Sequence, residues 1–146
     1  VNTGRELMQK FILGKGAAAN SIFADILMRN ISVRDTGSES FYHGLLLGLL
    51  SSARSQPIES NRESGDGYFD IRFYDKASDT AVLIELKQTK YPTELSAAAK
   101  EAVAQIHARH YYADFLDSGI SHIRLYGIAC CGKYCRTVKE TLSEEP

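Results

Sequence analysis

Three charged residues are the part of this sequence best suited to chemistry: Asp70, Glu85 and Lys87. Carboxylate oxygens are the ligands that Mg²⁺ and Mn²⁺ prefer, and such ions usually keep waters and phosphate oxygens in their remaining positions. An ammonium nearby can orient or help to deprotonate an attacking water, or stabilise the charge that builds on a phosphate. Two acids and a lysine brought together would therefore form a divalent-metal site able to cut phosphodiesters.

The residues around these side chains predict two neighbouring strands. Residues 68–74 alternate between apolar and polar types, residues 81–87 are almost wholly apolar until their end, and residues 75–79 have turn composition. If Tyr74 pairs with Ala81 in an antiparallel hairpin, the two acids lie opposite each other with Cβ atoms roughly 5 Å apart. Like charges that face each other are destabilising, and a bound cation would offset that repulsion.

A plainer interpretation stays open at this point. Glu85 and Lys87 could be an exposed cross-strand charge pair, with Asp70 a residue at the end of a strand, because an acid followed by Glu-x-Lys is common by chance. The apolar residues 82–84 favour the metal site, since charges that close so apolar a strand are rarely ordinary surface charges.

The composition sets limits on the whole chain. With 146 residues, 44% of them hydrophobic and 24% charged, it is typical of one soluble globular domain. A net charge of −1 does not support strong nonspecific binding of nucleic acid, which depends on many Lys and Arg contacts to phosphates. A partner or a local positive surface would then have to bind the phosphates. The positive residues from the catalytic strand onward are Lys87, Lys90, Lys100, Arg109, Lys133, Arg136 and Lys139.

Two further features of the sequence indicate where in the cell the protein acts. The sequence has no apolar run of about 20 residues, the length that spans a membrane, so we expect no membrane partner. Cys130, Cys131 and Cys135 have no matching ligand cluster elsewhere and are typical of small buried hydrophobes, which favours a reducing compartment such as the cytoplasm. The chain opens at Val1, which suits a segment of a longer protein.

The remaining sequence predicts helices on both sides of these strands. The expected elements are helices at 5–13, 20–29 and 39–52, strands at 58–63, 68–74 and 81–87, a helix at 93–116 and a strand at 123–130. The break at 14–16 lacks the spacing of a phosphate loop, residues 34–38 are expected to cap the next helix, and residues 64–67 to form a glycine turn. We expect one domain, 1–146, with a helical lead-in (1–37), a core (38–133) and a tail (134–146).

This order, with Asp70 and Glu85-x-Lys87 in the second and third strands, resembles the core of the PD-(D/E)XK nuclease superfamily. The resemblance implies an α/β, restriction-endonuclease-like core of order αβββαβ, with a mixed sheet flanked by helices. Blocks at 39–44, 60–67, 84–87 and 105–106 are similar to a bacterial branch that is usually found downstream of an ATPase-like domain. The similarity spans about residues 5 to 133.

The resemblance also implies roles for particular residues. Asp70 and Glu85 would ligate Mg²⁺ or Mn²⁺ together with the backbone carbonyl of Leu86, and Lys87 would be the catalytic lysine. Glu39, at the start of the first core helix, would act through a metal-bound water.

Further side chains are implicated by the same likeness. His43 would contact substrate or support Glu39, and the alternative is a satisfied buried histidine. Gln105 resembles a glutamine whose amide packs near the catalytic lysine, and the alternative is a solvent-facing helix residue. Tyr111 and Tyr112 stand where the family carries an aromatic, and we expect packing rather than catalysis from both.

One position departs from the family pattern. Where that pattern reads G-x-G-R-x-D, residues 65–70 carry Tyr68 in place of the arginine, so a phosphate contact is missing. Arg62 or Arg72 would compensate, or Tyr68 would alter the substrate preference or weaken activity. We place Tyr68, Arg62 and Arg72 with His43 as candidate substrate-binding residues.

Two functions follow as hypotheses. The first is a metal-dependent nuclease that hydrolyses phosphodiesters with a metal-activated water, with DNA favoured over RNA by the resemblance alone. The second is a catalytically weak or inactive nuclease-fold module that binds nucleic acid or a protein partner. The expected setting is the bacterial cytoplasm, with an ATPase-like domain or a second copy as possible partners, or delivery into a host cell as an effector or toxin.

Overall fold

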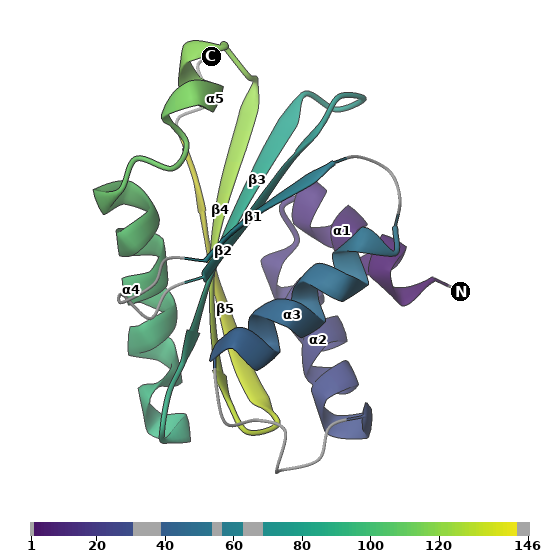
Figure 1. Cartoon of the computed structure of the whole chain (residues 1–146), viewed down its shortest axis with the longest axis vertical. Helices are drawn as coiled ribbons and strands as arrows, with labels where there is room; N and C mark the ends of the chain where they lie inside the picture. Colours follow the sequence, from purple (N-terminus) through teal and green to yellow (C-terminus); the bar gives the residue numbers. More distant parts are fainter. Residues whose placement is uncertain (1, 31–38, 54–56, 63–68, 143–146) are drawn as a thin grey trace.

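The computed structural model describes residues 2–30, 39–53, 57–62 and 69–142. The predicted α/β architecture is confirmed: a five-stranded mixed sheet lies between helices on its two faces (Figure 1). The elements are α1 (Thr3–Ile12), α2 (Gly16–Asn30), α3 (Glu39–Ser51), β1 (Ile58–Arg62), β2 (Phe69–Asp75), β3 (Thr80–Gln88), η2 (Pro92–Glu94), α4 (Leu95–Ala108), α5 (Ala113–Asp117), β4 (His122–Cys131) and β5 (Tyr134–Thr141). No helix in these ranges is long and apolar enough to cross a membrane.

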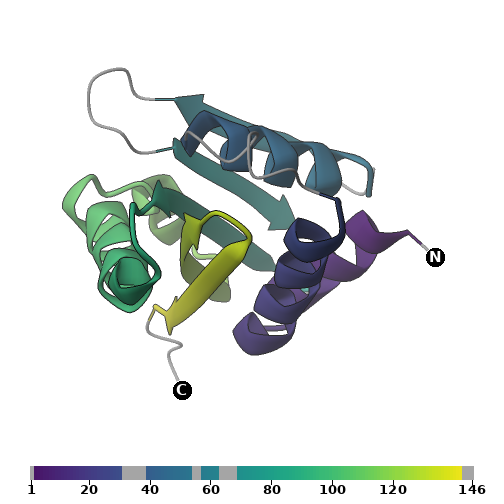
Figure 2. The ribbon, with the colours of Figure 1, turned by 90° about the horizontal axis from the view of Figure 1, so that it is seen from below.

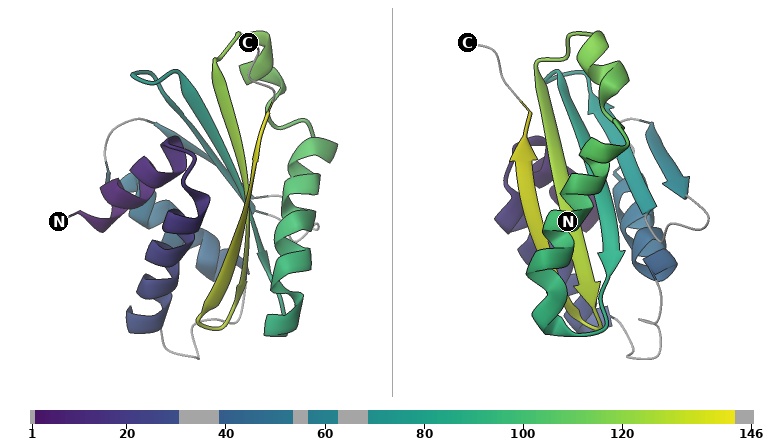
Figure 3. Two further views of the ribbon diagram at one scale, coloured as in Figure 1. Left: turned by 180° about the vertical axis from the view of Figure 1, so that it is seen from behind. Right: turned by 90° about the vertical axis from the view of Figure 1, so that its left-hand side faces the viewer.

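The sheet has the strand order β1-β2-β3-β4-β5, and only the β3–β4 pair is parallel. A parallel pair needs a crossover connection, and α4 supplies it by running across one face of the sheet (Figure 3). Seen from below, α2 and α4 lie on opposite sides of β5 (Figure 2). In the β2–β3 hairpin Tyr74 pairs with Ala81 and Asp70 with Glu85, which confirms the predicted register.

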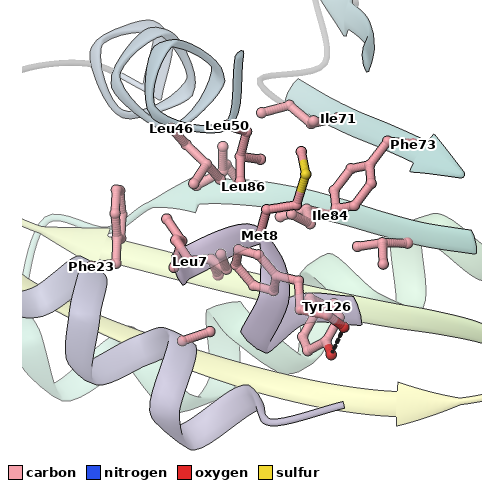
Figure 4. Packing of buried hydrophobic residues seen from close by; sticks show 14 of the residues in the cluster. Leu7, Met8, Phe23, Leu46, Leu50, Ile71, Phe73, Ile84, Leu86 and Tyr126 are labelled. Carbon is pink, nitrogen blue, oxygen red and sulfur yellow. Dashed lines mark hydrogen bonds between the residues drawn. The ribbon is translucent and has the colours of Figure 1, made fainter. Parts of the chain in front are cut away.

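The larger core fills the space between the sheet and the first three helices. Ile71, Ile84 and Leu86 point into this core (Figure 4). Asp70 and Glu85 alternate with these residues along β2 and β3, so they face away from it. On the opposite face a second apolar cluster joins β3, β4 and α4. Because β3 is buried on both faces, its nearly continuous apolar sequence is explained.

Helix α4 lies unusually close to the sheet at Gly127 of β4. A Cβ atom at this glycine would be 2.0 Å from the carbonyl oxygen of Ala99, and would also crowd the side chains of Ala102 and Val103. Alanines and a glycine therefore set the distance between α4 and the sheet, and with it the depth of the space beside the acids.

Two predicted elements were wrong in extent. The helix expected at 93–116 is divided into η2, α4 and α5, and α4 ends before α5 because the chain turns at His110, whose φ of 53° is left-handed. The expected tail contains β5, which pairs antiparallel with β4 as an edge strand. The break between the first two helices is confirmed, with Gly14 at a φ of 78°. The turns expected at 34–38 and 64–67 lie outside the described residues.

Candidate active site

Asp70 and Glu85 form a facing pair of carboxylates on the side of the sheet that α4 covers. Both side chains are buried, with Asp70 at 7% exposure and Glu85 at 0%. The pair follows from the local sequence, because alternation in β2 and the apolar run of β3 turn these positions to the same face. Two buried acids directly opposite each other are an arrangement that costs stability unless a positive charge lies near.

A cleft of about 490 Å³ opens beside this pair. Of the two acids, Asp70 lines the cleft, together with Ile106 of α4 and Tyr111 from the segment after it. Glu59 and Ser60 of the edge strand β1 close the other side. The lining combines the carboxylates of Asp70 and Glu59 with Arg72 and Tyr111, and such a site can hold a cation and a polar substrate.

Lys87 lies two residues after Glu85 and on the same face of β3, as the sequence predicted. Its Nζ is 2.6 Å from Oε1 of Glu101 on α4, and its side chain is 24% exposed. The ammonium therefore lies between the sheet and α4 rather than in bulk solvent. The catalytic role assigned to Lys87 stays a prediction.

Glu39 begins α3 and reaches the carboxyl-terminal end of β3. Its Oε1 accepts a hydrogen bond of 3.1 Å from the backbone N–H of Gln88. Its Oε2 is buried and has no hydrogen-bond partner among the described residues. Burial raises the pKa of Glu39, while the Gln88 hydrogen bond and the charge of Lys87 act in the opposite direction.

His43 lies one turn after Glu39 and is buried. Its Nε2 is 2.8 Å from Oγ of Ser60, a residue of β1. This contact joins α3 to the edge strand and fits the alternative interpretation, a satisfied buried histidine. A role in substrate binding stays a prediction.

Arg72, a candidate phosphate contact, is engaged by neighbouring side chains. Its guanidinium makes two hydrogen bonds of 2.7 Å to the carboxylate of Asp114, and it also pairs with Glu59 and bonds the carbonyl of Tyr111. The Phe115 ring lies 4.4 Å below it. The bond to Asp114 raises the pKa of Arg72. Any contact of this residue with substrate stays a prediction.

The other two candidates for a phosphate contact are Arg62 and Tyr68, and the structure describes less of them. Arg62 is the last residue of β1, and its side chain is outside what the structure describes. Tyr68 lies wholly outside the described residues.

Three side chains after the middle of α4 form a chain of hydrogen bonds next to the acids. Gln105, with its amide oxygen turned toward Arg109, accepts a hydrogen bond of 3.0 Å from Nη2 of that residue, whose Nη1 donates to the Tyr111 hydroxyl at 3.0 Å. Burial raises the pKa of Tyr111 to about 12, and the charges of Glu85 and Asp70 add to the shift. Sequence reasoning gave Tyr111 only a packing role and gave Arg109 none at this site.

These donors suit a hard cation with an incomplete protein shell. Among the described residues, no group of three or more His, Cys, Asp and Glu side chains could hold a metal ion. Mg²⁺, however, is usually bound by one or two carboxylates and keeps waters and phosphate oxygens as further ligands. Asp70 and Glu85 provide such a pair, and Glu39 places a buried carboxylate oxygen without a hydrogen bond near the end of the same strand.

Comparison with known proteins identifies the family to which this chain belongs. A sequence model of the PD-(D/E)XK nuclease superfamily matches residues 37–140, well over half of the chain. The chain therefore belongs to the PD-(D/E)XK nuclease superfamily, and its fold is the restriction-endonuclease-like one. No curated protein and no solved structure matches it. Membership supports a nuclease type of function, and the narrower likeness to a branch with an ATPase-like domain stays a prediction.

Proposed function

We propose that this chain is a Mg²⁺- or Mn²⁺-dependent nuclease that hydrolyses phosphodiesters at the Asp70–Glu85 pair, in DNA rather than RNA. The observation that carries the proposal is the pairing of two buried carboxylates face to face in a member of a nuclease superfamily. Preference for DNA rests on family likeness alone.

Different residues of the chain would bind the cation, the attacking water and the phosphate. Asp70, Glu85 and the carbonyl of Leu86 would hold the cation, which would lower the pKa of a water and offset negative charge on the phosphate. Glu39 accepts a hydrogen bond from water through its unengaged Oε2. Lys87 donates hydrogen bonds to the attacked phosphate, which requires its ammonium to exchange Glu101 for substrate.

Substrate contacts are proposed for four further residues. Arg72 lines the cleft beside Asp70 and would contact a phosphate if its guanidinium exchanged Asp114 or Glu59 for substrate. His43, Arg62 and Tyr68 complete the proposed set, with the tyrosine at the position where the family carries arginine. Gln105 acts through Arg109 and is a positioning residue.

Plasmid cleavage tests the proposal directly. The purified protein should nick or linearise supercoiled DNA with Mg²⁺ or Mn²⁺ and not with EDTA. Asp70→Ala, Glu85→Ala and Lys87→Ala should each abolish cleavage, whereas Asp25→Ala, an exposed carboxylate on α2, should retain it. Circular dichroism checks that each variant is folded. Cleavage that survives in the folded variants would refute the site assignment.

A second candidate is an inactive nuclease-fold module that binds nucleic acid or a protein partner. The pairing of Lys87 with Glu101 favours it, since the ammonium already has a partner. Titration calorimetry with Mn²⁺ separates the two candidates. A nuclease should bind the ion in a manner that needs both Asp70 and Glu85, and an inactive module should not. A partner ATPase-like domain, a homodimer, and cytoplasmic or delivered action all stay predictions.

A further inference from the structure

A second groove lies away from the cleft, between the end of α2, η2 and the start of β5. It encloses about 450 Å³ and is bordered by Met28, Pro92 and Tyr134. Lys133 and Arg136 provide its charges, and no acidic side chain lines it among the described residues. An apolar floor with cations at the border suits a ligand that is both flat and negatively charged.

One tyrosine that lines this groove, and a second that precedes the lining residue Pro92, are more exposed than large side chains usually are. Tyr134 is 58% exposed at the start of β5, and Tyr91, which precedes Pro92 of η2, is 56% exposed. Lys90 places its Nζ 5.9 Å from the centre of the Tyr91 ring. Exposed aromatic rings among cations are the features that bind single-stranded nucleic acid, because bases stack on the rings while phosphates meet the cations.

The groove and the acid site lie at the same end of the sheet. The last residue of β3, Gln88, pairs with Cys130 of β4, and Cys130 pairs in turn with Cys135 in the groove wall. Helix α3 contacts both places: Glu39 bonds the N–H of Gln88, and the Tyr42 hydroxyl donates a 2.8 Å hydrogen bond to the carbonyl of Gly132 in the β4–β5 turn. Figure 1 shows this turn beside the end of β3 where α4 begins.

A further hollow lies along the end of β3, η2 and the start of α4. It encloses about 530 Å³, and its lining carries two cations, Lys87 and Lys90, and two acids, Glu94 and Glu101.

We propose that the groove bordered by Tyr134, Lys133 and Arg136 binds a single-stranded segment of nucleic acid whose adjoining phosphate lies at the acid site. Bases stack on Tyr134 and Tyr91, and phosphates pair with the cations. A duplex fits poorly, because its bases are already stacked on one another and cannot reach the rings. This inference rests on the proposed function for the link to cleavage, although binding itself needs no metal.

An acidic protein segment is the rival occupant. It would use Lys133 and Arg136 equally well but would gain little from a flat ring. The two exposed tyrosines favour nucleic acid, since stacking is a contact that every base can make and an acidic peptide cannot.

Fluorescence anisotropy in EDTA tests the inference without cleavage. The probe is a labelled oligothymidylate of about 16 nucleotides, at the upper end of typical single-strand site sizes. Tyr134→Ala should weaken its binding about tenfold, within the range that loss of one stacked base gives. Tyr134→Phe keeps the ring and should bind as the wild type does. Arg136→Gln should weaken binding and reduce its dependence on salt.

Controls separate this inference from the proposed function. Leu116→Ala removes an exposed apolar side chain of α5 and should leave binding unchanged. Equal binding of the probe by wild type and Tyr134→Ala would overturn the inference. So would a Tyr134→Ala variant that loses the same affinity for a duplex as for the single strand, or a wild type that binds oligoglutamate as tightly as the oligothymidylate. Normal probe binding without plasmid cleavage would refute only the nuclease, and cleavage with an unaffected Tyr134→Ala variant would refute only the groove.

Discussion

Replacement of Glu85 by Gln should make the metal-free protein more stable while it removes the response to Mn²⁺. Glu85 is fully buried and faces Asp70 across the β2–β3 ladder. Glutamine has nearly the same shape, so the packing around it is kept and only the charge is lost. A site that holds two like charges close together for the sake of a cation should gain stability when one charge is removed.

The magnitude follows from the register. Facing Cβ atoms are roughly 5 Å apart, and two like charges at that distance repel by about 3 kcal/mol at an effective dielectric constant of 20. The positive charge of Lys87 on the same face offsets part of this, so we expect a net gain of about 1–2 kcal/mol. For a chain of this size that corresponds to a rise in Tm of about 3–6 °C.

Thermal unfolding in EDTA and in Mn²⁺ measures both effects. In the wild type, Mn²⁺ at one hundred times its Kd should add about 2.7 kcal/mol, and Glu85→Gln should lose this increment. Asp25→Asn is the matched control: it neutralises an exposed carboxylate paired with Arg29 and should change neither value by more than about 0.5 kcal/mol. A Glu85→Gln variant that is less stable in EDTA, or that is still stabilised by Mn²⁺, would refute the reasoning.

Two further predictions concern stability. Gly127→Ala should lower the free energy of unfolding by about 3 kcal/mol, because its Cβ would lie 2.0 Å from the Ala99 carbonyl oxygen. Gly48→Ala on α3, where a Cβ meets open space, should raise it by about 0.5–1 kcal/mol. Urea unfolding measures both, and equal effects would contradict the close packing of α4. Asp114→Asn should cost about 0.5–1 kcal/mol at neutral pH, since Asp114 is 59% exposed yet bonded twice to Arg72. The hydrogen bond from Arg72 lowers the pKa of Asp114, so the difference from wild type should be full above about pH 4 and vanish as the pH falls through the lowered pKa. A difference that persists at lower pH would exclude the ion pair as its source.

The facing acids could be predicted from sequence because two local signals agree. A turn at residues 75–79 fixes which residues of the hairpin oppose each other, and the alternation of β2 fixes which face each side chain takes. A slip of one residue would have buried Asp70 in the larger core, where Ile71 now packs. Register and face were therefore determined together.

The edge strand β5 could not be predicted in the same way. Its residues are half-buried or exposed on both faces, so no apolar alternation marks them. The strand is held by long-range contacts instead, such as the 2.8 Å hydrogen bond from Thr137 to Asn20 of α2. Such pairings have no local signature in the sequence.

The position of Tyr111 depends on another feature without a sequence signal. Helix α4 ends at Ala108 although neither Gly nor Pro follows directly, and the reversal uses a left-handed His110. Had the helix continued, Tyr111 would have followed the helix axis. The reversal instead carries it to the cleft wall beside Asp70 and allows Arg109 to bond its hydroxyl.

The distribution of charge explains how a chain of net charge −1 can act on a polyanion. The positive side chains nearest the acids are engaged, Lys87 by Glu101 and Arg72 by Asp114, so the cleft alone offers little grip on phosphate. Lys133 and Arg136 lie instead in the groove at the β4–β5 turn, where no described lining residue is acidic. In the proposed function, separation of the two places would let the acids keep the negative potential that attracts a metal cation, while the groove would hold the substrate. Cations placed directly at the acids would attract the phosphates of the substrate, but they would also repel the metal cation and weaken its binding.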